Sequence, residues 1–255
     1  PAALAEAGRA YADARAAVEP TFADVAWTTE LGPCRTILAT KGGSLFRFLS
    51  GEYRAQLALL RSLLKVPLDS PSILDLPTDR IAESDLADVL WRDPSGIDIL
   101  LAPPRIEQAG MVTIRDLEKV LGILRRVYSV LVVDLPSALS EISLAFLDAS
   151  DTIVEIVTYD STTIHNTIAV ADTFRQIGYP PAKVHYLVNR ADSAGGISPD
   201  DLERALGRVP EHRVVSDGKL VVGSNNDGVP FVLAAPTAPI SQDIVRLASE
   251  LVTSS

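Results

Sequence analysis

A lysine and two glycines follow the first apolar run of the chain. Residues 34–40 read CRTILAT, and Lys41, Gly42 and Gly43 come next, ahead of a segment whose apolar residues recur every three or four positions. Glycines between a strand and a helix let backbone N–H groups approach a phosphate, and the helix N-terminus adds partial positive charge. The pattern indicates a phosphate-binding turn, with a tight strand-to-helix connection as the alternative.

Two more polar side chains stand near the ends of apolar runs. Asp134 lies in the run 129–136, and Asn189 lies in the run 183–190. A carboxylate at the end of a buried strand can hold the hydration shell of Mg²⁺ beside a nucleotide, although it can also be a capping or loop residue. An asparagine can donate to and accept from an adenine edge, although asparagines are also common in turns.

These residues need a framework that brings strand ends together. Apolar runs predict strands at 34–40, 97–104, 129–136, 152–158, 183–190 and, more weakly, 212–216. Between them, periodic apolar residues and capping signals predict helices at 4–18, 44–64, 84–94, 113–128, 139–148, 161–177, from 198, 217–225 and 240–252. Apolar strands alternating with helices predict an α/β fold with a mostly parallel, doubly wound sheet. Such sheets bind ligands at the carboxyl ends of their strands.

Composition excludes several classes of protein. The 255 residues include 33 acidic and 23 basic side chains, for a net charge of −10, which disfavours binding to nucleic acid or anionic membrane. Cys34 is the single cysteine, so an intrachain disulfide and a multi-cysteine metal site are excluded. The histidines His165, His185 and His212 are far apart in sequence and show no ligand spacing. No apolar run reaches the roughly 18 residues of a membrane span.

Five segments together carry a family resemblance. They are CRTILATKGG, SGIDILLAPP, YSVLVVDLPSALSEISLAFLDASDTIVEIVT, GYPPAKVHYLVNRADSAGGISPDDLERALGR and NNDGVPFVLAAP. In this order they resemble the MinD/ParA superfamily of deviant Walker A P-loop ATPases, and within it the CpaE/TadZ-like group of pilus assembly proteins. The resemblance implies a P-loop domain over residues 34–255. It also implies that residues 1–33 are the last helix and linker of a receiver-like domain.

The resemblance gives each candidate residue a role. Lys41 would be the family's signature lysine, which reaches the nucleotide of the partner subunit, and Gly42 and Gly43 would be the first two glycines of the phosphate loop. Asp134 would be the Walker B aspartate at the Mg²⁺ site, and Asn189 the asparagine that contacts adenine. Lys41 and Asp134 are thus the expected catalytic residues, with ATP and Mg²⁺ as the expected cofactors.

The phosphate loop departs from the family motif, which runs Lys-Gly-Gly-any-Gly-Lys-Thr/Ser. Leu45, Phe46 and Arg47 stand where the third glycine, the phosphate-binding lysine and the Mg²⁺-ligating hydroxyl belong. The family's second strand, with an aspartate that positions water, also lacks a counterpart. Three explanations stay open: a degenerate relative that does not hydrolyse ATP, a missing piece of chain, or a frame shift within the first 65 residues.

The resemblance implies a homodimer that binds ATP and Mg²⁺ and acts in type IV (Flp/Tad) pilus assembly or its localisation. Its partners would be pilus or secretion machinery proteins, with no nucleic acid. It would be cytoplasmic without an integral membrane segment, and would reach the cell pole or inner-membrane face through its partners. The altered loop leaves ATP hydrolysis in question. The alternative is a nucleotide-independent scaffold, a pseudo-ATPase that dimerises and recruits pilus machinery.

Overall fold

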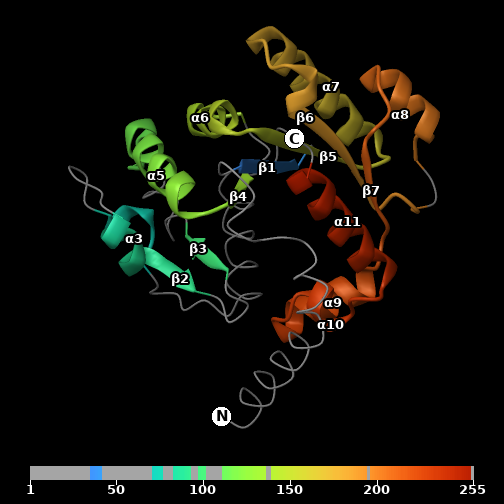
Figure 1. The fold of residues 1–255 in the computed structure, drawn as a ribbon. Helices are drawn as coiled ribbons and strands as arrows, with labels where there is room; N and C mark the ends of the chain where they lie inside the picture. Colours follow the sequence, from blue (N-terminus) through green and yellow to red (C-terminus); the bar gives the residue numbers. More distant parts are fainter. Residues whose placement is uncertain are drawn as a thin grey trace. The chain divides into compact units, whose positions relative to one another are not determined.

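The structure is a computed structural model that describes residues 35–41, 71–76, 83–92, 97–101, 111–135, 139–193 and 196–253. The chain divides into two compact units (Figure 1). The sheet unit spans Pro33–Arg47, Tyr128–Asp217 and Pro239–Ser255. The second unit spans Pro1–Gly32, Phe48–Val127 and Gly218–Ala238. The helices expected at 4–18 and 44–64, like Gly42 and Gly43, lie outside the described residues.

The sheet unit is built on five parallel strands. Their order across the sheet is β4 (Val130–Leu135), β1 (Arg35–Lys41), β5 (Thr152–Val157), β6 (Val184–Asn189) and β7 (His212–Val214). Every neighbouring pair is parallel, so the expected parallel α/β sheet is confirmed. From β1 the chain adds β4 on one side and the remaining strands on the other. Such a switch point is where open α/β sheets bind ligands.

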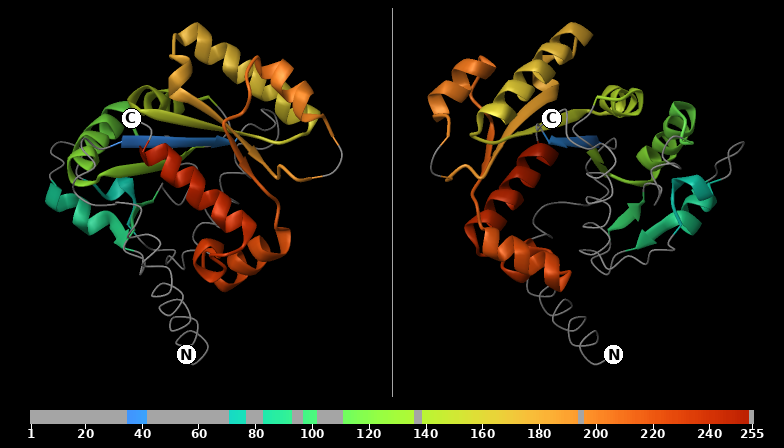
Figure 2. Two further views of the ribbon diagram at one scale, coloured as in Figure 1. Left: turned by 45° about the vertical axis from the view of Figure 1, so that its right-hand side comes forward. Right: turned by 180° about the vertical axis from the view of Figure 1, so that it is seen from behind.

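Helices cover both faces of this sheet. On one face lie α6 (Glu141–Ala149), α7 (Ser161–Ile177) and α8 (Pro199–Leu206), and on the other lies α11 (Pro239–Thr253) (Figure 2). The short 3-10 helix η2 (Pro181–Lys183) leads into β6. The doubly wound arrangement predicted from the alternation of apolar strands and helices is therefore present.

The core of the sheet unit lies around β5 and β6. Ile153, Val157 and Val188 are fully buried on these strands, as are Leu147 on α6 and Leu202 on α8. Both strands are buried along most of their length, because helices cover them from both sides. Burial of this kind stabilises a domain by about 25 cal/mol for each Å² of apolar surface removed from water.

The strand β4 is less buried than its sequence predicts. Val132 is 71% exposed, and Asp134 is exposed as well. One side of the strand is therefore open to solvent, and the expectation of a strand buried throughout at 129–136 is wrong. Apolar composition alone does not reveal which strand of a sheet is covered on both faces.

The helix α7 begins with a side-chain cap. Asp160 accepts a hydrogen bond from the backbone N–H of Thr163 at 2.7 Å and another from the Thr163 hydroxyl at 2.6 Å. The helix ends at Gly178, whose φ of 91° suits glycine. The helix predicted at 161–177 is thus confirmed, with Asp160 as its N-cap.

Replacing Asp160 by alanine should lower the free energy of unfolding by about 1–2 kcal/mol, because an orphan helix N–H loses its partner. Urea denaturation followed by circular dichroism measures the change. Asp172→Ala is the matched control, since the Asp172 side chain is about half exposed and forms an ion pair with Arg175 one turn on; its cost should stay below about 0.5 kcal/mol. Equal costs for the two variants would contradict the capping role.

The second unit corrects three expectations. Residues 98–100 do not join the parallel sheet, because β3 (Asp98–Leu100) pairs antiparallel with β2 (Leu90–Arg92). The short helix expected to run to about residue 94 ends earlier, as α3 (Glu83–Val89). Between the helices predicted at 217–225 and 240–252, where no element was expected, the structure has α10 (Phe231–Ala234).

A charged pair holds the two-stranded sheet. Arg92 donates from Nε and Nη2 to the two carboxylate oxygens of Asp98, both at 2.6 Å. The two residues are directly opposed in the ladder, where opposite charges stabilise the pairing.

The other elements that the structure describes in the second unit are helical. They are η1 (Ile73–Asp75), α5 (Ile114–Val127) and α9 (Gly218–Asp227). Thr113 accepts from the backbone N–H of Asp116 at 3.2 Å and so caps α5, in the region where a helix was predicted at 113–128. Among the helices that the structure describes, none is both long and apolar enough to cross a membrane.

Candidate functional site

Three of the five candidate residues reach one edge of the sheet. Lys41 is the last residue of β1, Asp134 is the penultimate residue of β4, and Asn189 is the last residue of β6. In the register, Asp134 lies opposite Ala39, two residues before Lys41. Because all these strands are parallel, their carboxyl ends share that edge. Gly42 and Gly43 lie outside the described residues, as do Phe46 and Arg47.

The Asn189 side chain is exposed and held in one orientation. Its Oδ1 accepts the backbone N–H of Arg190 at 2.9 Å. Arg190 has a φ of 55°, so the chain turns sharply away from the sheet at this point. With the oxygen engaged, the amide NH₂ remains as a donor, and this suits recognition of an acceptor nitrogen on a purine ring. The assignment of oxygen and nitrogen follows from this hydrogen bond.

The loop after Asn189 is fastened on two sides. The backbone N–H of Ala191 donates to the carbonyl of Val214 at 2.9 Å, and the N–H of Ile197 donates to the carbonyl of Tyr159 at 2.9 Å. Asp192 accepts the backbone N–H of Ser216 at 2.6 Å. These bonds tie the loop to the ends of β5 and β7, so they fix the surroundings of Asn189.

Gly196 is the second special position of this loop. Its φ is +96°, and a Cβ added there would lie 2.0 Å from the carbonyl oxygen of Tyr159. Both observations require glycine. Sequence reasoning missed Asp192 and Gly196 as parts of the site, although the paired glycines of SAGGIS give a signal of an unusual backbone.

Asp134 suits a hydrated magnesium ion. Mg²⁺ usually keeps several waters and is bound through one or two carboxylates together with substrate phosphates. Asp134 supplies one exposed carboxylate at the strand end. Over the described residues, no group of three or more histidine, cysteine, aspartate or glutamate side chains could hold a metal by itself. The donor set therefore fits an ion that arrives with a nucleotide.

Sequence comparison finds a distant relative. No family model matches the chain. An uncharacterized ATP-binding protein of Methanocaldococcus jannaschii is 22% identical over 171 residues, which is 67% of this chain and 64% of that protein. The chain thus spans less than two thirds of the length of this relative.

Solved structures give a closer likeness in three dimensions. A ParA family ATPase of Chlorobium tepidum has a TM-score of 0.68 at 17% identity, covering 86% of this chain and 99% of that one. MinD of Pyrococcus horikoshii, solved with Mg-ADP, has a TM-score of 0.59 at 16% identity, covering 86% and 96%. MinD in the MinC:MinD complex of Aquifex aeolicus has a TM-score of 0.64 at 19% identity, covering 89% and 86%. The fold is that of the ParA and MinD ATPases.

The ParA/MinD fold agrees with the coarser part of the sequence interpretation. The superfamily resemblance correctly anticipated the fold. At these levels of identity the likeness is one of fold, and none of the three structures belongs to the CpaE/TadZ group by its description. The ligand of this chain has to be inferred from its own residues at the carboxyl edge of the ParA/MinD-type sheet.

Proposed function

We propose that residues 34–255 form a nucleotide-binding domain of the MinD/ParA type, which takes ATP with Mg²⁺ at the carboxyl edge of its sheet. The observation that carries the proposal is the gathering of Lys41, Asp134 and Asn189 at that edge. Asp134 would hold the hydration shell of the ion, and the Asn189 amide would contact adenine. The ATP-binding relative supports the same ligand.

The finer role that we propose is in type IV (Flp/Tad) pilus assembly or its localisation, as in the CpaE/TadZ group. The segments from 95–104 through 225–236 resemble that group in the same order. In this role the protein would act as a cytoplasmic homodimer, with Lys41 of each subunit reaching the nucleotide of the other. Its partners would be proteins of the pilus or secretion machinery.

The altered phosphate loop bears on ATP hydrolysis separately from nucleotide binding. Phe46 stands at the position of the lysine that neutralises the phosphates, and Arg47 stands at the position of the Mg²⁺-ligating hydroxyl. Hydrolysis depends on positioning and on neutralising the charge of the transferred phosphoryl group. We therefore propose nucleotide binding as the function of the site.

Calorimetric titration of the full chain with ATP and Mg²⁺ tests this proposal. We expect micromolar binding that weakens at least about tenfold in Asn189→Ala and Asp134→Ala, because each removes a polar contact worth roughly 1.5 kcal/mol. Asn226→Ala is the control for the amide, since Asn226 is an exposed residue of α9; it should bind as the unaltered protein does. Failure to bind at millimolar ATP would overturn the proposal.

A second function is favoured by the same loop. The protein would be a nucleotide-independent scaffold that keeps the fold, dimerises and recruits pilus proteins. Phe46 and Arg47 are the observation in its favour. Sedimentation with and without ATP separates the two functions: a dimer that forms equally in both conditions supports the scaffold, and a dimer that needs ATP supports the nucleotide-binding protein.

A further inference from the structure

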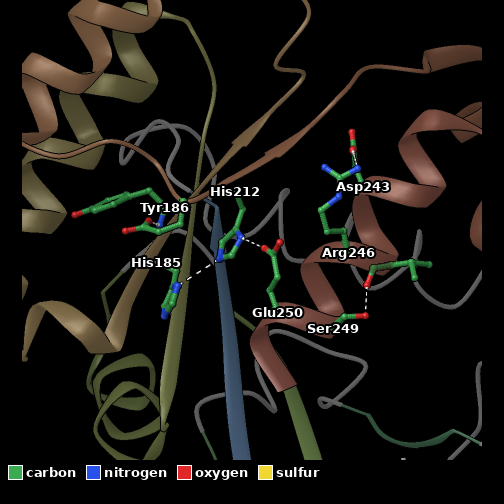
Figure 3. A network of polar contacts seen from close by, with 9 residues as sticks. His185, Tyr186, His212, Asp243, Arg246, Ser249 and Glu250 are labelled. Atoms are coloured by element: carbon green, nitrogen blue, oxygen red, sulfur yellow. Dashed lines mark hydrogen bonds and ion pairs between the residues drawn. The ribbon is translucent and has the colours of Figure 1, made fainter. Parts of the chain in front are cut away.

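Two histidines and a glutamate meet in the sheet unit (Figure 3). Nε2 of His212 on β7 lies 3.3 Å from Nδ1 of His185 on β6. Nδ1 of the same His212 ring lies 2.9 Å from Oε2 of Glu250 on α11. The histidines show no ligand spacing in the sequence, yet the fold brings two of them into contact.

Strand register and helix packing bring these side chains together. Side chains alternate along a strand, so His185 and Leu187 share one face of the sheet. His212 is paired with Leu187, and it therefore lies on the same face. The helix α11 packs against β7 and carries Glu250 to the two rings, as Figure 3 shows.

Glu250 determines which nitrogen of His212 carries a proton. An ionised carboxylate only accepts hydrogen bonds, so Nδ1 of His212 donates to Glu250. In the neutral ring Nε2 then holds a lone pair, and this lone pair faces His185. Donation of the other ring N–H to a carboxylate is the usual outer contact of a metal-binding histidine, because it orients the ring and makes it a better ligand.

His185 has the second common kind of outer contact. Its ring makes a hydrogen bond with the backbone of Ala182, in the short helix before β6. Nδ1 faces His212, so Nε2 is the nitrogen that is available to the Ala182 carbonyl. When both outer nitrogens donate, two lone pairs face each other across the contact. A positive species between them, a proton or a metal ion, removes their repulsion.

The separation of the facing nitrogens suits a shared metal ion. Zn²⁺ binds imidazole nitrogens at about 2.0–2.1 Å in tetrahedral geometry, which places two such nitrogens about 3.3–3.4 Å apart. The observed distance is 3.3 Å, whereas hydrogen bonds from N–H to oxygen usually measure about 2.7–3.2 Å. The ring centroids are 5.4 Å apart, close to the roughly 5.2 Å expected for two imidazoles on one such ion.

The pair combines a buried ring with access from solvent. The His212 side chain is 8% exposed, that of Glu250 is 48% exposed, and His185 is half-buried. The buried ring is a fixed anchor, while the open side admits an ion with its water molecules. The charges of Arg208 and Glu211 also act on His185, but these two residues pair with each other. Glu250 is thus the carboxylate that counters the charge of an ion.

The donor atoms determine the class of ion. Imidazole nitrogen suits Zn²⁺, Cu²⁺ and Ni²⁺, whereas Mg²⁺ and Ca²⁺ prefer oxygen ligands. Over the described residues, histidine, cysteine, aspartate and glutamate side chains form no group of three or more that could hold a metal. The two imidazoles would therefore share the ion with water molecules. Structural zinc sites have four protein ligands, so a site with two is open and exchanges its ion.

We propose that His185 and His212 together bind one divalent transition-metal ion, Zn²⁺ or Cu²⁺, and that Glu250 orients His212 as a ligand. The ion joins β6 to β7, and Glu250 extends the link to α11. The site is separate from the candidate nucleotide edge, because His185 lies near the start of β6 and Asn189 at its end, about 13 Å along the strand. Failure of the metal site would therefore leave the proposed nucleotide site standing.

Proton NMR of the imidazole C2–H groups locates the ion. Zn²⁺ at micromolar concentration and pH 7.5, added to the full chain without a polyhistidine tag, should shift the signals of His185 and His212 together. His165, an exposed residue of α7, should keep its signal, and millimolar Mg²⁺ should move none of the three. Unchanged His185 and His212 signals at millimolar Zn²⁺ would overturn the site. Equal shifts of all three histidines would also overturn it, in favour of an adventitious ion only.

Calorimetric titration with Zn²⁺ tests the role of each side chain. Glu250→Gln keeps both ligands and should weaken binding about tenfold, the lower end of the range for outer contacts of metal sites. His185→Ala should weaken binding further, because a direct ligand is lost. Cu²⁺ should bind the unaltered chain more tightly than Zn²⁺ does.

Glu203→Gln is the matched control for the carboxylate. Glu203 is an exposed residue of α8, so this variant removes the same charge at a distance from the rings and should bind Zn²⁺ as the unaltered chain does. Equal affinities in Glu250→Gln and Glu203→Gln would refute the role of Glu250, in a comparison that leaves both imidazoles in place. Undiminished binding in His185→Ala would overturn the site itself.

Discussion

Restoring the phosphate loop should raise the affinity of the protein for MgATP by about 10- to 100-fold. The triple variant Leu45→Gly, Phe46→Lys, Arg47→Thr rebuilds the motif that follows Lys41-Gly42-Gly43. The new ammonium group would make charge-assisted hydrogen bonds to phosphate oxygens, each worth about 1.5–3 kcal/mol. At 1.4 kcal/mol for each factor of ten, about one such bond accounts for the expected gain.

Calorimetric titration with MgATP measures this gain, and a phosphate-release assay measures any hydrolysis that accompanies it. Leu45→Gly, Phe46→Leu, Arg47→Thr is the matched control, since it loosens the loop without adding the charge; it should bind no better than the unaltered chain. Adding Asp134→Ala to the restored loop should remove most of the gain. A restored loop with unchanged affinity would indicate that the chain around residues 43–64 does not form the family's phosphate site.

Gly196→Ala should destabilise the sheet unit by about 2–5 kcal/mol, from backbone strain and crowding together. The new Cβ would lie 2.0 Å from the carbonyl oxygen of Tyr159, and the backbone φ of +96° already disfavours any L side chain. To relieve the contact, the loop must move away from Tyr159 and lose the hydrogen bond from Ile197. Since this loop follows Asn189, MgATP binding should weaken as well.

Gly207→Ala is the control that separates backbone strain from crowding. Gly207 ends α8 with a φ of +70°, but a Cβ there would meet nothing within 4 Å. In this control only the left-handed backbone conformation disfavours the alanine, which lowers the free energy of unfolding by about 1–2 kcal/mol. Nucleotide affinity should be unchanged. Urea denaturation gives both costs. If Gly196→Ala proved no more destabilising than Gly207→Ala, the close approach to Tyr159 would not constrain the loop.

The parallel sheet was predictable because its strands are apolar runs separated by capped helices. Runs such as 152–158 and 183–190 match β5 and β6 to within one residue at each end. The caps at Asp160 and Ser198 likewise mark the starts of α7 and α8. These signals are local, and local signals are what a single sequence carries most directly.

The errors come from features that depend on distant parts of the chain. The run at 97–104 reads like a core strand, yet Asp98 meets Arg92 across an antiparallel pair. Val132 reads as core and is exposed. Neither the partner of a strand nor the covering of its faces is written in the strand itself.

The candidate site was anticipated in part because two of its residues stand at the ends of apolar runs, which are local signals. Asp134 and Asn189 were recognised because they follow apolar runs, and parallel pairing then brings such strand ends to one edge. The pairing of His185 with His212 could not be read from spacing, since 27 positions separate them. Only the register of β6 with β7, combined with the packing of α11, places both imidazoles and Glu250 in contact.

The place of β1 in the sheet also sets the timing of assembly during synthesis. Arg35–Lys41 is made first, yet its two neighbours are Val130–Leu135 and Thr152–Val157. At translation rates of about 5–20 residues per second, β1 waits on the order of 5–25 s for the second of them. Both edges of this apolar strand lack a partner until β4 has been made, and one edge still lacks its partner until β5 has been made. An unpaired strand edge is the kind of segment that aggregates or recruits a chaperone. We expect the growing polypeptide to depend on such protection until β5 has left the ribosome.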